Sequence, residues 1–321
     1  MNVSVILCTY NRSKSLALAL ESIAACEMPT STDWRVLIVD NNSKDQTRAV
    51  AESFSSRYPA RFQYLFESQQ GKSHALNRGI REAQGEVVAF VDDDVTVEPD
   101  WLHALTQPFA DDPQLAATGG RIYLPKNFTP PDWLKLDGPA SLGGVLALFD
   151  LGPAPVPLTV APIGTNMAYR KSVFEKYGLF RTDLGPRPGS DLRYEDTEFG
   201  GRLLAAGEKL LYVPGAIVHH DVAEPRLHKS YYLTYFYNYG RALVREGRER
   251  TSMGYLVGLG NRVLVHVPKR VRFWWKETDK GTRFFFKCLV WAMFGEIAEM
   301  ASRVFSAGPR QNNLQAQPSK R

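Results

Sequence analysis

The sequence predicts an α/β fold, in which helices flank a mostly parallel central sheet and a helical extension follows toward the C-terminus. Short apolar runs, rich in β-branched and aromatic residues, alternate with longer amphipathic segments, as strands and helices do in such folds. Several of these runs end in polar or acidic residues. The carboxyl ends of strands are where ligands bind in an open α/β sheet, so we expect a binding site at that edge.

Length and composition limit the possibilities. The chain has 321 residues, of which 44% are hydrophobic, enough for one large domain or two. Cys8, Cys26 and Cys288 are too scattered for a disulfide framework or a metal site, which favours a reducing, cytoplasmic location. The first predicted strand begins almost at the initiator methionine, without a charged and apolar leader, so we do not expect secretion.

The net charge of +5 is unevenly distributed along the chain. Residues 226–321 contain 18 Lys/Arg and 6 Asp/Glu, a balance of +12, whereas residues 1–225 contain 21 and 28, a balance of −7. We therefore expect three parts: a main domain over residues 1–225, a basic and aromatic helical extension over 226–306, and a disordered tail over 307–321.

The first expected strand spans residues 3–8, and the helix after it spans residues 13–25. The turn between them, Thr9-Tyr10-Asn11-Arg12, contains no Gly-x-Gly-x-x-Gly sequence and no Lys-Ser/Thr phosphate loop. This turn argues against a dinucleotide-binding Rossmann domain and against a P-loop NTPase.

The next two strands, over residues 35–39 and 62–66, each lead to a polar turn. The first ends at Asp40, whose carboxylate could accept hydrogen bonds from a nucleobase or ribose. The second is followed by Gly71-Lys72 and a helix. A helix N-terminus that carries a lysine suits an anionic ligand, because its free N–H groups and the ammonium both attract negative charge.

The central expected strand, residues 87–91, ends in three consecutive carboxylates, Asp92-Asp93-Asp94. Three adjacent acids are tolerable beside Mg²⁺ or Mn²⁺, which prefer carboxylate oxygen and still accept phosphate oxygen. The sequence thus favours a metal-dependent nucleoside-diphosphate site over a merely solvated acidic turn. Because neighbours on an extended segment point oppositely, we expect Asp92 and Asp94 to share a face and Asp93 to point elsewhere.

The following segments are predicted as a helix over 99–109, a strand over 115–123 and a Pro/Gly-rich stretch over 124–162. That stretch could form an acceptor-side wall or only a covering loop. Residues 161–170 contain a strand, and 181–193 look like a mobile loop. The acids Glu195 and Asp196 begin a helix. Acids at this position can also be explained by their favourable interaction with the helix dipole, without a role in a site. Two short strands, 210–214 and 216–220, are expected last.

In this order, the pieces resemble the GT-A glycosyltransferases of family 2. The resemblance rests on Val-Ser-Val-Ile-Leu-Cys-Thr-Tyr-Asn-Arg at 3–12, Val-Asp-Asn-Asn-Ser at 39–43, Gly71-Lys72, and Phe-Val-Asp-Asp-Asp at 90–94. It covers about residues 1–241. It implies a GT-A catalytic domain and an inverting transfer of a sugar from a nucleoside diphosphate to a hydroxyl group.

The resemblance also implies which residues form the site. Metal binding would fall to Asp94 and His220, the general base would be Asp196, and Glu195 would orient the acceptor. The residues expected to bind the nucleotide sugar are Thr9, Tyr10, Arg12, Asp40, Lys72, Asp92, Asp93 and Asn166.

The implied ligands follow from this chemistry. We expect Mg²⁺ or Mn²⁺, a UDP-sugar as the favoured donor, and a glycan or lipid-linked acceptor in polysaccharide biosynthesis, with no role for nucleic acid. A nucleotidyltransferase that makes a nucleotide sugar is an alternative, although the chain lacks the Gly-rich, Arg/Lys-bearing first loop that such an enzyme would need. An inactive carbohydrate- or membrane-binding protein on the same fold is another.

The helical extension has a composition of its own. Residues 284–305 are apolar but interrupted by charges, which argues against a spanning helix. Aromatic residues mixed with Lys/Arg are typical of an interfacial helix on anionic lipid. We expect a cytoplasmic protein that lies peripherally on the inner face of the cell membrane; an oligomer contact is the alternative.

Overall fold

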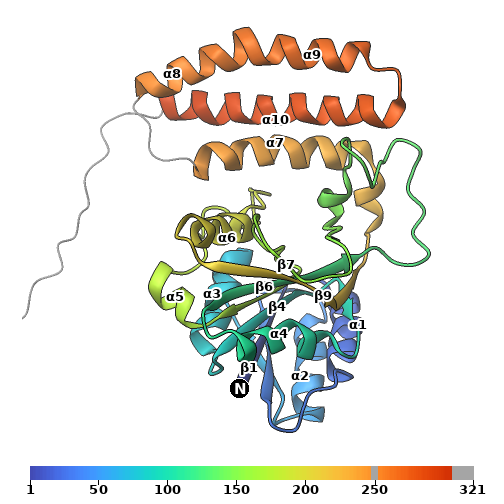
Figure 1. The fold of residues 1–321 in the computed structure, drawn as a ribbon, viewed down its shortest axis with the longest axis vertical. Helices are drawn as coiled ribbons and strands as arrows, with labels where there is room; N and C mark the ends of the chain where they lie inside the picture. The colour runs from blue at the N-terminus through green and yellow to red at the C-terminus, as the bar shows by residue number, and fades with distance from the viewer. Residues whose placement is uncertain (247–251, 306–321) are drawn as a thin grey trace, which may run out of the picture.

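A computed structural model describes residues 1–246 and 252–305 of the chain (Figure 1). Its centre is a nine-stranded sheet in the order β3-β2-β1-β4-β8-β6-β9-β5, with β7 paired to β9. The strands are β1 (Asn2–Thr9), β2 (Asp33–Asp40), β3 (Phe62–Phe66), β4 (Val87–Asp92), β5 (Val95–Val97), β6 (Leu115–Tyr123), β7 (Val156–Pro157), β8 (Asn166–Arg170) and β9 (Lys209–His220). The predicted tail, residues 307–321, lies outside the described residues.

The sheet is mostly parallel, as predicted: six of its nine strands, β1, β2, β3, β4, β6 and β9, run in one direction, and the short strands β5, β7 and β8 run against it. The pairings β1–β2, β1–β4, β2–β3 and β6–β9 are parallel. The pairings β4–β8, β6–β8, β5–β9 and β7–β9 are antiparallel. Strand β8 inserts against the common direction between β4 and β6, a position that the sequence pattern of a buried strand does not reveal.

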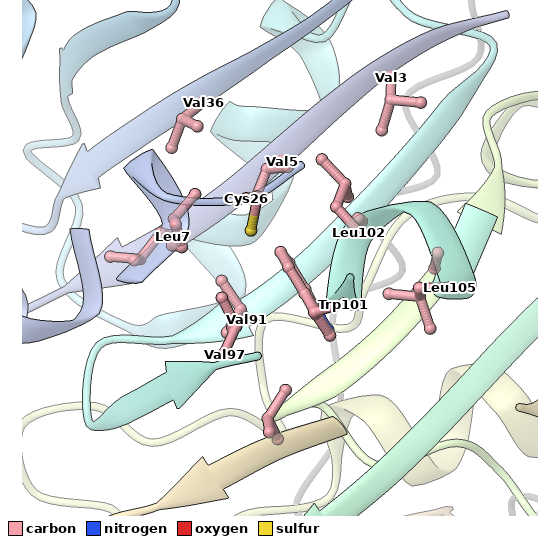
Figure 2. Packing of buried hydrophobic residues seen from close by; sticks show 14 of the residues in the cluster. Val3, Val5, Leu7, Cys26, Val36, Val91, Val97, Trp101, Leu102 and Leu105 are labelled. Atoms are coloured by element: carbon pink, nitrogen blue, oxygen red, sulfur yellow. The ribbon is translucent and has the colours of Figure 1, made fainter. Parts of the chain in front are cut away.

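Helices cover both faces of the sheet, and a separate apolar core fills each side. Strand β1 shows why: its side chains alternate, with Val3, Val5 and Leu7 in one core and Ile6 in the other. Figure 2 shows the first of these cores, where Trp101 and Leu102 pack against β1. The covering helices are α1 (Ser13–Ala24), α2 (Thr47–Arg57) and α4 (Trp101–Asp111) on that side, and α3 (Lys72–Glu82), α5 (Ser172–Tyr177) and α6 (Glu195–Ala205) on the other.

The prediction of two short strands over 210–214 and 216–220 is wrong, because these residues belong to a single strand, β9. The register against β6 jumps from Gly120–Val213 to Arg121–Ile217, so three residues of β9 bulge out between these pairs. One of the three is Pro214, which has no N–H to donate to a ladder and is tolerated at such a bulge. The chain therefore continues past the proline as one strand.

The extension forms a layer of helices above the sheet (Figure 1). Helix α7 lies nearest the sheet, and α10 packs against α7 on one side and against α8 and α9 on the other. The elements are the 3₁₀ turn η2 (Glu224–Leu227), α7 (Lys229–Glu246), α8 (Ser252–Asn261), the π-helical turn η3 (Arg262–His266), α9 (Val267–Lys276) and α10 (Lys280–Phe305). In the described part of the chain, no helix is both long and apolar enough to cross a bilayer.

Candidate active site

A cavity of about 860 Å³ opens at the carboxyl ends of the central strands. The strand register places Asp92 beside Cys8 and Asp40 beside Thr9, so polar chain ends meet at one edge. The triple-aspartate turn lines this cavity together with the acid pair Glu195 and Asp196, which begins α6 more than a hundred residues later. The acids that the sequence singled out therefore face one shared space.

The aspartate turn is held by Arg12. Its guanidinium donates to Asp93 at 3.0 Å and to Asp94 at 2.6 Å, so both carboxylates face the same group. The prediction that Asp93 points away is wrong, because β4 ends at Asp92 and strand alternation stops there. Burial raises the pKa of Asp93 to about 6 despite Arg12, so this acid changes charge near neutral pH.

Asp94 is also buried, but its surroundings favour the anion. Burial alone would raise its pKa; the guanidiniums of Arg12 and Arg226 outweigh burial and hold the pKa well below the usual value. The Arg226 guanidinium lies 3.3 Å from the Asp94 carboxylate. Asp94 thus stays charged over the physiological pH range.

Lys72 joins the aspartate turn to the acid pair. It is the first residue of α3, where the preceding Gly71 has φ of 140°, a conformation that L side chains rarely adopt. The Lys72 ammonium bonds to Asp92 at 2.7 Å and lies 3.8 Å from Glu195. Burial by itself would raise the pKa of Asp92, but the nearby Lys72 ammonium outweighs this effect and lowers the pKa.

Glu195 is only 4% exposed, and burial raises its pKa to about 7, with Lys72 partly offsetting the effect. One of its oxygens accepts the Tyr194 N–H at 3.1 Å. Because burial brings the pKa into the neutral range, both the protonated and the ionised form are available near neutral pH. The side chain can therefore donate or accept a hydrogen bond in the cavity.

Asp196 is fixed by backbone groups. One carboxylate oxygen accepts the Gly164 N–H at 2.7 Å, and the other accepts the Thr197 N–H at 2.7 Å. Each carboxylate oxygen can accept a further hydrogen bond, so the group keeps the capacity to receive a proton. The loop before β8 and the start of α6 together set its direction into the cavity.

His220, at the end of β9, is nearly fully buried and has a defined tautomer. A guanidinium can only donate, so the 2.8 Å contact from Arg226 makes the His220 Nε2 atom an acceptor. The Nδ1 atom then donates to the Leu146 carbonyl at 2.8 Å. The Nε2 lone pair is thereby directed at Arg226 and lies 3.5 Å from Asp94. The neighbouring His219 bonds instead to Glu98 on the other face.

Asp94 and His220 fit a divalent cation whose remaining coordination positions are filled by a bound ligand. Within residues 1–246 and 252–305, no three His, Cys, Asp or Glu side chains gather closely enough to hold a metal alone. The Asp94 carboxylate and the His220 Nε2 atom nevertheless lie 3.5 Å apart and supply two atoms that can ligate a metal. Mg²⁺-type sites often use one or two protein carboxylates and complete their coordination with substrate phosphates and water.

The comparison with known families agrees with this geometry. The family model described as glycosyl transferase family 2 matches residues 4–178, more than half of the chain. The chain belongs to this family. It is therefore a glycosyltransferase, and the nucleotidyltransferase alternative lacks comparable support.

Known relatives and solved structures agree with this assignment. The succinoglycan biosynthesis protein ExoM of Rhizobium meliloti is 29% identical over 227 residues, 70% of this chain and 69% of ExoM. The glucosyl-dolichyl phosphate glucuronosyltransferase of Haloferax volcanii is 25% identical over 233 residues, 70% of this chain and 71% of that protein. The mannosyltransferase PcManGT of Pyrobaculum calidifontis, solved with GDP-Man and Mn²⁺, has a TM-score of 0.56 at 19% identity, covering 96% of this chain and 76% of its own.

A second solved structure, GalNAc-T7 with UDP, GalNAc and Mn²⁺, also has a TM-score of 0.56 at 19% identity. It covers 76% of this chain and 47% of its own. At this level of identity the two structures establish the GT-A fold, which confirms the fold predicted from the sequence.

Two predicted site residues of the glycosyltransferase lie behind the cavity. The carboxylate of Asp40 accepts the Ser43 N–H at 2.9 Å and the Tyr64 hydroxyl at 3.1 Å. The amide of Asn166 accepts from the Trp101 indole at 2.8 Å and donates to backbone carbonyls. Neither residue lines the cavity. The remaining predicted residues do line it: Thr9, Tyr10, Arg12, Lys72, Asp92, Asp93, Asp94, Glu195, Asp196 and His220.

Other lining residues were not predicted. Arg187 and Arg193 come from the loop expected to be mobile, and Tyr235 comes from α7. The 3₁₀ turn η1 (Gly143–Leu146) supplies Gly144 and Val145, so the 124–162 stretch does form a wall. The sign in the sequence that this loop belongs to the site is these two arginines. Arginines by themselves are too common to identify a diphosphate site.

Proposed function

We propose that this glycosyltransferase is metal-dependent and inverting, and that it transfers a sugar from a nucleoside-diphosphate donor, with UDP favoured, to a hydroxyl group. The proposed acceptor is a lipid-linked or membrane-bound glycan in polysaccharide biosynthesis. One observation carries the proposal: the aspartate turn, the converging Asp94 and His220, and the carboxylate of Asp196 all face one cavity. The enzyme would act in the cytoplasm, peripherally on the inner face of the cell membrane.

The donor half of the cavity suits a diphosphate. Asp94 and His220 would hold the cation, which would neutralise charge on the departing nucleoside diphosphate. Arg12 and Arg226 already contact the Asp94 carboxylate, so two guanidiniums lie where phosphate oxygens would approach. Guanidinium groups bind phosphate through paired donors, which supports a role for both in donor binding.

The acceptor half suits proton removal. A hydroxyl group must lose its proton as it attacks the anomeric carbon, and a positioned carboxylate can take that proton. Asp196 keeps its position through two backbone N–H contacts and faces the cavity. Glu195, beside it on α6 and with its pKa raised to about 7 by burial, would hydrogen-bond to the acceptor hydroxyl or to a neighbouring one.

The names of related proteins support the proposed substrates. One relative is named for succinoglycan biosynthesis, and another for a glucosyl-dolichyl phosphate. The two solved neighbours hold Mn²⁺ with GDP-Man in one case and with UDP and GalNAc in the other. These proteins use different bases and sugars, so the donor of this enzyme has to be found by experiment.

The decisive experiment is a panel of nucleotide sugars with and without Mn²⁺, read by thermal unfolding. A donor that binds only the folded state raises the melting temperature by mass action. We expect one nucleotide sugar to stabilise the enzyme in the presence of Mn²⁺ and not in chelator. That donor should then be turned over with a lipid-linked glycan, and NMR should show inverted anomeric configuration. Binding without any transfer or hydrolysis would instead indicate an inactive binding protein.

A further inference from the structure

The helices that follow α7 in the extension expose much of the apolar surface of the described chain. Twelve large hydrophobic side chains are exposed in the described part of the chain, and seven of them lie between residues 257 and 294. Leu264 and Trp275 are each 77% exposed, more than any of the others. The seven are Val257, Val263, Leu264, Val265, Phe273, Trp275 and Phe294. Exposed apolar surface that is concentrated in one region indicates an interaction site.

The π-helical turn η3 accounts for part of this surface. Three consecutive aliphatic residues, Val263, Leu264 and Val265, are all exposed there. A regular amphipathic helix would turn at least one of three such neighbours inward. Single π-helical turns within helices are rare and are frequently found at functional sites.

Helix α9 separates an inner apolar stripe from an outer basic face. Val267, Val271 and Trp274 are partly buried and have the spacing of one helical face, toward α10. Four cations are exposed on the rest of the helix, and none of them forms an ion pair with any described residue. These cations are Lys269, Arg270, Arg272 and Lys276. The outer face thus mixes unpaired positive charge with the aromatic rings of Phe273 and Trp275.

The charge of this region decides what it can bind. Residues 257–280 contain six Lys/Arg and two Asp/Glu, a balance of +4. A second copy of the chain would bring the same positive charge to the contact and would be repelled. An anionic lipid surface is complementary: it takes indole and aliphatic side chains at headgroup level and attracts Lys/Arg.

Close packing joins the outer helices to α7, the helix that contributes to the active-site cavity. Helices α7 and α10 approach so closely at Gly240 and Gly295 that a Cβ atom on either would overlap backbone of the other helix. Glu299 on α10 also pairs with Arg241 and Arg245 of α7. Since α7 supplies Tyr235 to the cavity, the outer helices and the active site form one continuous stack.

We propose that one outer face, hereafter the docking face, binds the anionic surface of a phospholipid bilayer without crossing it; it consists of Val257, Val263, Leu264, Val265, Lys269, Arg270, Arg272, Phe273, Trp275 and Lys276. The apolar side chains of η3 and α9 insert among the headgroups, and the α9 cations contact lipid phosphates. This role depends on the proposed function: the docking face would bring the enzyme to an acceptor that is carried in the membrane.

The test is co-sedimentation of the full chain with two kinds of vesicle, phosphatidylcholine alone and phosphatidylcholine mixed with phosphatidylglycerol. We expect binding to the anionic vesicles only, weakened by salt. The double variant Arg270→Gln/Arg272→Gln should bind them about 30-fold more weakly, since each cation near an anionic surface contributes about a factor of five. The matched control Arg57→Gln/Arg81→Gln removes two exposed cations elsewhere and should bind like the unaltered chain.

The apolar part of the docking face is tested separately. Leu264→Ser and Trp275→Ser should each weaken vesicle binding, while Leu18→Ser, which alters a side chain 65% exposed on α1, should not. Unchanged thermal unfolding would show that each variant is folded. Equal binding by the docking-face variants and the unaltered chain would overturn the proposal, as would equal binding to neutral vesicles. Self-association without lipid that Leu264→Ser abolishes would also overturn it.

Failure of the docking face and failure of the proposed function give different results. The Mn²⁺-dependent stabilisation by a nucleotide sugar takes place in solution and does not involve residues 257–280. If vesicle binding fails while donor binding succeeds, the docking face is wrong and the glycosyltransferase site stands. If vesicles bind and no donor does, the docking face stands and the proposed donor chemistry is wrong.

Discussion

At the scale of single residues, Asp196 is the side chain on which turnover should depend most. The variant Asp196→Asn keeps the size of the group but cannot take a proton. We expect the transfer rate to fall by about 10²–10⁴-fold, the usual contribution of a general base, with donor affinity preserved. Single-turnover kinetics and donor titration measure the two quantities. Asp111→Asn, at an exposed acid far from the cavity, is the control. Near-normal turnover would remove Asp196 from the role of base.

Arg226 makes a second residue-scale prediction. Its guanidinium occupies the His220 Nε2 lone pair and contacts Asp94, the two donors that a cation would need. A metal must therefore displace Arg226 before it can use both. We expect Arg226→Gln to bind Mn²⁺ several-fold more tightly in the absence of donor and to bind the nucleotide sugar more weakly.

Isothermal titration with Mn²⁺ alone measures the first effect of Arg226→Gln, and a donor titration measures the second. Opposite signs are diagnostic. A purely structural role for Arg226 would weaken both affinities, because loss of packing around His220 would disturb both ligands. Arg187→Gln, a cavity arginine without contact to Asp94 or His220, serves as the matched control.

Glu195 predicts a pH-dependent stability. Its pKa is raised to about 7 in the folded protein, so between about pH 4.5 and 7 the folded state holds more protons than the unfolded state. The contribution of Glu195 to stability is therefore present at low pH and lost as the pH rises through 7. Glu195→Gln cannot ionise. Its stability relative to the unaltered chain should rise from pH 5 to pH 8, by up to about 3 kcal/mol, in urea unfolding. A constant difference across this range would contradict the raised pKa.

Sequence reasoning succeeded at this scale where chain geometry alone decides position. Polar residues at the carboxyl ends of strands and at the starts of the helices that follow were expected at one edge, and the aspartate turn, Lys72 and Asp196 do line one cavity there. Sequence reasoning did not anticipate that Tyr64 and Trp101, from other elements, hydrogen-bond to Asp40 and Asn166, or that these two residues do not line the cavity. Which side chain satisfies a buried polar group is a tertiary fact that local pattern does not contain.

At the scale of elements, the contact between α7 and α10 gives a sharp test. A methyl group at Gly295 would overlap the Tyr237 carbonyl, so the helices must separate. We expect Gly295→Ala to destabilise the protein by about 1–3 kcal/mol, as overpacking does. Gly260→Ala is the matched control: its Cβ meets nothing within 4 Å, and better helix propensity should stabilise it by up to about 1 kcal/mol. Thermal unfolding compares the two, and equal effects would contradict the close approach.

Most elements were predictable because their signals are local. The strand over 115–123 and the helix that begins at Lys72 occur as expected, set by apolar periodicity and by Gly71. The exception is β9, where Pro214 suggested a break. The partner strand β6 spans that break by a register shift, and the position of a partner cannot be inferred from a single segment. The antiparallel direction of β8 was hidden for the same reason.

At the scale of the whole molecule, the helical extension and the main domain share apolar cores. Leu142 and Leu146, before β7, pack in one cluster with Tyr232 and Phe284 from the extension. The predicted boundary at residue 225 therefore does not separate two independent cores. We expect a single unfolding transition, with tryptophan fluorescence and loss of donor binding coinciding.

Phe284→Ala tests the shared core. Removing a buried phenylalanine typically costs about 3–5 kcal/mol. If the two parts unfold together, the variant should lower the temperature at which donor binding is lost, although Phe284 lies outside the cavity. Phe294→Ala, at a residue of the same helix that is 41% exposed, is the control. Two separate transitions, of which only one responds to Phe284→Ala, would show that the parts are independent.

The order of the helices above the sheet has a consequence for the length of the acceptor. Two interaxial distances separate α9 from α7, because α10 lies between them, and each is about 8–10 Å. With α9 resting on lipid, the catalytic hollow stands about 16–20 Å off the bilayer. Sugars attached directly to the lipid carrier fall short of that height. If the docking face binds lipid as proposed, we therefore expect the enzyme to extend a glycan that already carries several sugars, and not to make the first additions to the lipid carrier.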